Sequence, residues 1–125
     1  MLAVCQQFGV QDNLIPGIAS GFGGGMGGTG SVCGAVSGAV MAIGLRQGRA
    51  TTAEGMPRAY EFVRELRSRF EEAMGSIYCR ELTGFDFGMK LEGFIESGVP
   101  QRVCFPAVGT AYRLALEMIE KASHE

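Results

Sequence analysis

Residues 21–44 read GFGGGMGGTGSVCGAVSGAVMAIG and contain a single cysteine, Cys33, in a run of glycines that carries no charged side chain. Glycine has no Cβ, so backbones can approach one another closely along such a stretch. A thiol held there meets a restricted set of partners. Because Cys5, Cys79 and Cys104 lie far away in the sequence, the fold decides which of them reach Cys33.

Length and composition bound the possible classes of protein. A chain of 125 residues is long enough for one domain with a real hydrophobic core. The net charge is −2, and charges of both signs are mixed through the second half, so we expect no nucleic-acid partner. A hydrophobic content of 46% argues against disorder.

The uncharged segment from Leu14 to Leu45 raises the question of a membrane span. It covers 32 residues, but 11 of them are glycine, and its most apolar part, 31–45, fits a buried core helix better. A membrane span is therefore disfavoured. The N-terminus lacks a basic stretch followed by an apolar one, so we expect no signal peptide and a cytoplasmic location, where lasting disulfides are rare.

The apolar spacing predicts an all-α fold, a single-domain bundle of about five helices around the glycine-rich buried helix at 31–45. No segment alternates with a period of two, so strands are not expected. We expect one domain over residues 1–125. The apolar helical pattern is present from Met1 onward, so we expect that an N-terminal part of the first helix is missing from this chain.

Individual helices follow from caps and periodicity. We expect a first helix at 1–9 that ends at Gly9, and a second that is capped by Asp12 or Asn13, has Pro16 in its first turn and breaks in the glycine run. A third helix, at 31–45, is apolar all round and should be buried. Further helices are expected at 56–74, within 85–95 and from Pro106 onward. The helix at 56–74 is the clearest, with Ala59, Val63, Leu66, Phe70 and Ala73 on one face. An i,i+4 pair, Glu65 and Arg69, supports it. The last helix carries Val108, Ala111, Ala115, Met118 and Ala122 on one stripe.

Two interpretations of the glycines compete. Gly25, Gly27 and Gly30 match the letters G-x-G-x-x-G, but no strand precedes them and no acidic residue follows at the spacing that a nucleotide fold requires. Fourfold spacing at Gly30, Gly34 and Gly38, and again at Gly17, Gly21 and Gly25, favours close packing of helices. Such a strip could also serve a contact between subunits of a homo-oligomer.

The spacing of the cysteines leaves several roles open. Separations of 28, 46 and 25 residues exclude the C-x-x-C pairs of zinc ribbons and thioredoxin-like motifs. A zinc or iron–sulfur site would need long-range convergence, and His124, the single histidine, lies in a polar tail that we expect to be solvated. Inert cysteines buried in the core are the simplest alternative.

Two cysteines have neighbours that favour a thiolate. Cys104 stands just before the expected helix start at Pro106, where free N–H groups attract negative charge, and Cys79 precedes the cation Arg80. We therefore expect both thiols to have a lowered pKa.

Three motifs make the chain resemble a known family: GFGGGMG at 21–27, CGAVSG at 33–38 and GSIYCREL at 75–82. They look like the redox-active protein family named for its C…CGAxxG…C…C pattern, and the resemblance extends over nearly the whole chain. It implies a small domain in which Cys33, Cys79 and Cys104 are the second, third and fourth shared cysteines. Cys5 lacks the expected context of the first, which implies that this chain lacks the first family cysteine.

We accordingly expect thiol redox chemistry, as dithiol/disulfide exchange or thiol-based sensing, with Cys33 as the central thiol and Cys79 and Cys104 as its partners. A metal or iron–sulfur protein using the same thiolates, and a structural or partner-binding domain with inert cysteines, are the alternatives. The sequence specifies no cofactor, no metal and no redox partner.

Overall fold

A computed structural model describes residues 1–49, 51, 58–85 and 91–123. These residues form an all-α fold, as predicted, with seven α-helices rather than about five and no strand. In chain order the elements are α1 (Leu2–Gln7), the 3-10 helix η1 (Gly17–Phe22), α2 (Gly23–Met26), α3 (Gly34–Gln47), α4 (Ala59–Met74), α5 (Cys79–Thr83), α6 (Leu91–Glu96), the π-helix η2 (Pro100–Cys104) and α7 (Phe105–Ser123).

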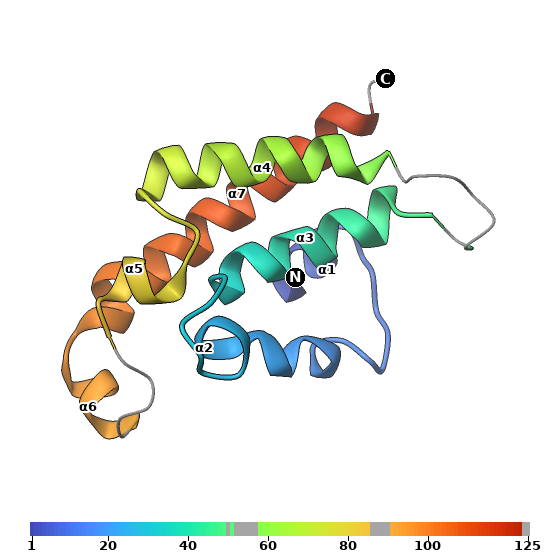
Figure 1. Ribbon diagram of the computed structural model, residues 1–125. Coiled ribbons are helices and arrows are strands. Elements are labelled where there is room, and N and C mark those ends of the chain that lie inside the picture. The colour runs from blue at the N-terminus through green and yellow to red at the C-terminus, as the bar shows by residue number, and fades with distance from the viewer. Residues whose placement is uncertain (50, 52–57, 86–90, 124–125) are drawn as a thin grey trace.

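Helices α3, α4 and α7 pack on one another and enclose most of the core (Figure 1). Helix α1 lies against α3 and α7, whereas α5 and α6 lie toward one end of the molecule. The largest fully buried side chains come from these three central helices: Ile43, Leu66, Phe70, Met118 and Ile119. Burial of such apolar area is the main stabilising contribution to a domain of this size.

Helix α3 differs from its predicted form at its start and in its burial. It begins at Gly34, because Ser31 to Cys33 is held extended by pairing with another segment. It is not buried all round. Its buried residues are Val36, Ala39, Ala42 and Ile43, whereas Leu45 keeps half of its surface exposed.

Helix α4 confirms the clearest prediction, although Met56 lies outside the described residues. Gly75 ends it in the left-handed conformation, with φ of 92°. Of the predicted face, Ala59, Leu66 and Phe70 are buried and Val63 is half-buried, but Ala73 is exposed. Phe62 is buried in addition.

The predicted Glu65–Arg69 ion pair within α4 is wrong. Both side chains instead reach across to α7, which runs beside α4 in the opposite direction (Figure 1). Lys121 contacts Glu65 at 3.0 Å, and Arg69 contacts Glu117 at 2.7 Å. These pairs are largely exposed, so each adds little stability, and both connect α4 to α7.

The early helices and the last one also depart from the prediction. Asp12 accepts the Leu14 N–H in a turn instead of capping a helix, and Pro16 precedes the 3-10 helix rather than lying within it. The glycine run does break the helix, since Gly24 and Gly25 adopt left-handed φ angles. The expected helix within 85–95 appears as α6, with 86–90 outside the described residues.

Helix α7 begins at Phe105 and continues the π-helix before it. Four of the five stripe residues expected here are buried: Ala111, Ala115, Met118 and Ala122. Val108, the fifth, is 55% exposed, and Ala107 takes the buried position instead. Among the described residues, no helix combines the length and apolarity that crossing a membrane requires.

The glycine strips are confirmed only in part. A Cβ at Gly34 would lie 3.1 Å from the Phe22 carbonyl oxygen, and one at Gly38 would lie 3.1 Å from the Met1 nitrogen. Gly30 lies in a loop outside the helix, and nothing approaches Gly17 or Gly21. Close helix packing therefore occurs on α3, at Gly34 and Gly38, whereas of the strip expected at 17–25 only Gly25 makes a close approach.

The close approach at Gly34 predicts a graded loss of stability. Gly34→Leu should lower the free energy of unfolding by about 1–3 kcal/mol, because its side chain must displace the backbone at Phe22. Gly34→Ala should cost less. Gly44→Ala, in the same helix with nothing within 4 Å of its Cβ, is the matched control and should be neutral or stabilising. Urea denaturation measures all three, and equal midpoints for Gly34→Leu and wild type would contradict the packing.

Candidate functional site

Two extended segments, far apart in sequence, bring Cys33 beside Cys79. The Cys33 N–H donates to the Ile77 carbonyl at 2.7 Å, and the Cys79 N–H donates to the Ser31 carbonyl at 2.7 Å. Val32 and Tyr78 form an isolated antiparallel bridge between them. Helix α3 starts directly after Cys33 and α5 starts at Cys79, so this short pairing joins the N-terminal ends of two helices.

The glycine run packs its backbone directly against Cys79. A Cβ at Gly25 would lie 2.7 Å from the Cys79 Cβ and 2.6 Å from the Ser31 nitrogen, and the φ of Gly25 is +70°. No side chain fits there. Its neighbours use their amide groups within the loop: the Gly30 N–H donates to Gly24 and the Ser31 N–H to Gly25. These amides are therefore not free to bind a phosphate, in agreement with the packing interpretation.

Cys104 comes to the same place from the C-terminal half of the chain. It is the last residue of η2, which contacts α5. The Phe105 N–H donates to the Pro100 carbonyl, and its backbone angles are helical. The polypeptide is thus helical on both sides of Cys104, and the expected free helix end is absent at this position.

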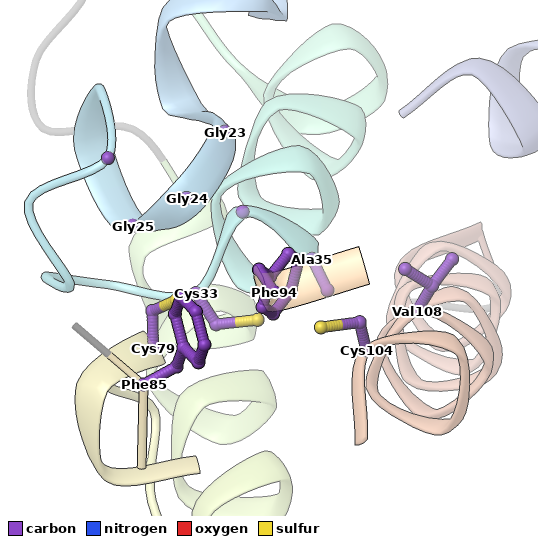
Figure 2. Close-up of a pocket in the computed structure, with 12 residues that line it drawn as sticks. Gly23, Gly24, Gly25, Cys33, Ala35, Cys79, Phe85, Phe94, Cys104 and Val108 are labelled. Atoms are coloured by element: carbon purple, nitrogen blue, oxygen red, sulfur yellow. The ribbon is translucent and has the colours of Figure 1, made fainter. Parts of the chain in front are cut away.

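The three cysteines line one pocket with a volume of about 490 Å³ (Figure 2). Its described lining residues come from the glycine run, the start of α3, and the segments around α5, α6 and α7: Gly23, Gly24, Gly25, Gly28, Cys33, Gly34, Ala35, Cys79, Phe85, Phe94, Cys104 and Val108. In Figure 2 the side chains of Cys33 and Cys104 point toward one another across this pocket. All four cysteines of the chain are free thiols.

Cys5 lies elsewhere. It belongs to α1 and is buried to 3% exposure beside Phe8 and Ala42. The structure therefore brings together the three cysteines that the sequence grouped and leaves the fourth apart.

The electrostatics of the pocket contradict the predicted lowering of two pKa values. Burial raises the pKa of the Cys79 thiol, and nearby Cys33 and Cys104 raise it further; a hydrogen bond with the Thr83 hydroxyl opposes this in part. Burial also raises the pKa of Cys104, with Cys33 adding to the effect.

Neither the Arg80 cation nor a free helix end lowers these pKa values as expected. The Arg80 guanidinium donates to the Thr29 carbonyl at 2.9 Å and its side chain covers Gly30. At Cys104 the helix is continuous, so its backbone offers no unpaired N–H end. Both thiols consequently hold their protons to higher pH than an exposed cysteine.

Two phenylalanines that no sequence motif marks as site residues also shape the pocket. Phe85 and Phe94 pack with ring centroids 5.1 Å apart and planes at 58°. Thr83 accepts the Phe85 N–H at 3.1 Å and donates to the Cys79 carbonyl at 2.7 Å, which ties the aromatic wall to a cysteine. Apolar spacing had placed these phenylalanines in an ordinary helix face, and no local signal distinguishes a wall from a core.

A metal centre finds no ready ligand set in the part of the chain that the structure describes. No three side chains of histidine, cysteine, aspartate or glutamate there are grouped closely enough to hold a metal ion. His124 lies outside the described residues.

The chain belongs to the family described as "Putative redox-active protein (C_GCAxxG_C_C)", whose model matches residues 1–118. The family's name writes its central motif as G-C-A-x-x-G, whereas residues 33–38 here read Cys-Gly-Ala-Val-Ser-Gly. Comparisons with curated proteins and with solved structures find no match. The family supports a redox role in general terms.

The raised pKa values predict a specific dependence of stability on pH. A thiol whose pKa is higher in the folded chain than in the unfolded chain stabilises the fold below the unfolded value, about 8.5, and loses that contribution as pH rises through the folded value. The free energy of unfolding of the reduced protein should therefore fall above about pH 8.5.

The double variant Cys79→Ser, Cys104→Ser should show a shallower decline than wild type across the same pH range. Urea denaturation under a reductant measures both curves. A decline of equal slope in the two proteins would mean that these thiols are not the cause.

Proposed function

We propose that this protein is a thiol redox protein in which Cys33, Cys79 and Cys104 form one reactive site. The observation that supports the proposal most strongly is the convergence of three cysteines, 46 and 25 residues apart, on a single pocket. Cys5, by contrast, lies in α1, away from the pocket. Membership of a family named for redox activity agrees with the proposal.

The reaction proposed is dithiol/disulfide exchange with a small disulfide. The thiolate of Cys33 attacks one sulfur of the substrate disulfide, R–S–S–R, forming a mixed disulfide and releasing one RS⁻, which takes up a proton. Cys104 then loses its proton and attacks the Cys33 sulfur, forming the Cys33–Cys104 disulfide and releasing the second thiol. The protein loses two electrons, and the substrate is reduced to two RSH molecules.

Three observations favour Cys33 as the attacking thiol. It is only partly buried, so a reagent in the pocket can reach it. It is the N-cap residue of α3, the end of a helix at which N–H groups favour negative charge. It also raises the pKa of both partners, which places it within electrostatic reach of each.

Cys104 is the proposed resolving thiol because its side chain faces Cys33 (Figure 2). Cys79 is the proposed reserve partner. It is the more buried of the two, at 7% exposure, so a substrate disulfide reaches it less readily than it reaches Cys104. Thiol-based sensing would use the same Cys33–Cys104 disulfide, formed once in response to an oxidant rather than in repeated catalytic cycles.

Oxidation followed by peptide mapping tests this proposal. Reduced protein treated anaerobically with a modest excess of bis(2-hydroxyethyl) disulfide should form an internal Cys33–Cys104 bond. Cys33→Ser should abolish that bond or divert it to Cys79–Cys104. Cys5→Ser is the matched control and should leave the mapped disulfide unchanged.

Other results would support the alternatives. Thiols that stay reduced and unreactive in the folded chain would indicate inert core cysteines. Bound zinc or iron in protein purified without oxygen, lost together with the three cysteines, would indicate a metal protein.

A further inference from the structure

The walls of the thiol pocket are apolar. Apart from its three cysteines, the side chains among its described lining residues are those of Ala35, Phe85, Phe94 and Val108, and the rest of the lining is glycine. None of these described residues carries a charge. A ligand at the thiols therefore loses water on these walls without gaining an ionic partner from them.

The charged residues that neighbour the cysteines in sequence are engaged outside this lining. Arg80 donates to the Thr29 carbonyl, and Arg102 donates to the Ser97 carbonyl at 3.3 Å. Glu81 accepts the Ser76 hydroxyl. Each of the three has a partner on a loop or turn, so none is held toward the pocket as a binding group for a charged substrate.

The shape of the pocket also suits an apolar group. The Phe85 and Phe94 rings, tilted against one another, form an aromatic wall beside the cysteines, and Val108 lies on α7 near Cys104 (Figure 2). A volume of about 490 Å³ falls within the range of small-molecule pockets, roughly 300–1,000 Å³. It exceeds the space that a disulfide group alone requires, which leaves room for organic substituents.

We propose that the substrate of this site is a small uncharged disulfide with apolar substituents, which are held against the aromatic wall while Cys33 attacks. This inference rests on the proposed thiol redox function and assigns its substrate class. Carrying a charged group into an apolar site without a partner is costly. Cationic and anionic disulfides are both rejected for this reason, whatever the net charge of the protein.

Three disulfides of similar size test the proposal: bis(2-hydroxyethyl) disulfide, which is neutral, cystamine, which is a dication, and 3,3′-dithiodipropionate, which is a dianion. The rate of disulfide formation in the folded protein is divided by the rate for the chain unfolded in urea, which removes intrinsic differences in reactivity. The neutral compound should exceed both charged ones by about tenfold or more. Dipropyl disulfide should react at least as fast as the hydroxyethyl compound.

A charge placed on the wall should change this selectivity. Val108 is 55% exposed, so Val108→Lys should fold. It should raise the relative rate of the dianion severalfold and lower that of the dication. Ser68→Lys, on the exposed surface of α4, adds the same charge away from the pocket and should leave the ratios unchanged.

Alkylation separates the failure of this inference from the failure of the redox function. The ratio of the iodoacetamide rate to the iodoacetate rate at Cys33, again relative to the unfolded chain, should be raised about tenfold. A raised ratio without disulfide formation would retain the apolar pocket and overturn the redox function. If disulfides form, but the relative rates change steadily from the dication through the neutral compound to the dianion, the redox function is retained and the apolar substrate class is overturned.

Discussion

The site depends on one short pairing of extended backbone, in which Ser31 and Cys33 exchange hydrogen bonds with Ile77 and Cys79. The pairing directly precedes the first turn of α3 on one side and of α5 on the other, so it makes Cys33 and Cys79 neighbours although 46 residues separate them in the sequence. It requires a backbone with no side chain at Gly25, which packs on the Cys79 Cβ. The glycine run is thus the structural condition for placing two thiols together, and its own amides are used within the loop.

Periodicity was enough to predict the fold class and the helix that ends at Gly75. It failed where tertiary contacts decide local structure. Helix α3 begins at Gly34 rather than at the predicted residue 31, because the residues before it pair with a distant segment. No local sequence pattern reveals this pairing. Glu65 and Arg69 have the spacing of a helical pair, yet both bond to α7, since an antiparallel neighbour offered Lys121 and Glu117. Val108 lies in phase with buried residues, but at the pocket end of the helix no core covers it.

The grouping of Cys33, Cys79 and Cys104 was predictable from resemblance to a family, and from nothing in their spacing. The raised pKa values of Cys79 and Cys104 were not predictable from the sequence. A flanking Arg80 suggested stabilisation of a thiolate, but its guanidinium bonds to Thr29, and burial dominates at Cys79. The aromatic wall could not be predicted either, because phenylalanines such as Phe85 and Phe94 give the same apolar sequence pattern in a core as beside a pocket.

Because η2 continues directly into α7, a bond formed at Cys104 would constrain the longest core helix. Cys104 is fixed to the helix that runs through the whole core, and Cys33 stands at the foot of another core helix. A covalent link between them would enclose α3, α4, α5 and α6 in a loop of about 70 residues, which lowers the chain entropy of the unfolded state by an amount equivalent to roughly 4 kcal/mol. If the proposed redox function holds, oxidation would therefore raise the free energy of unfolding of the whole domain, and the redox state of these two thiols would set how readily the protein unfolds.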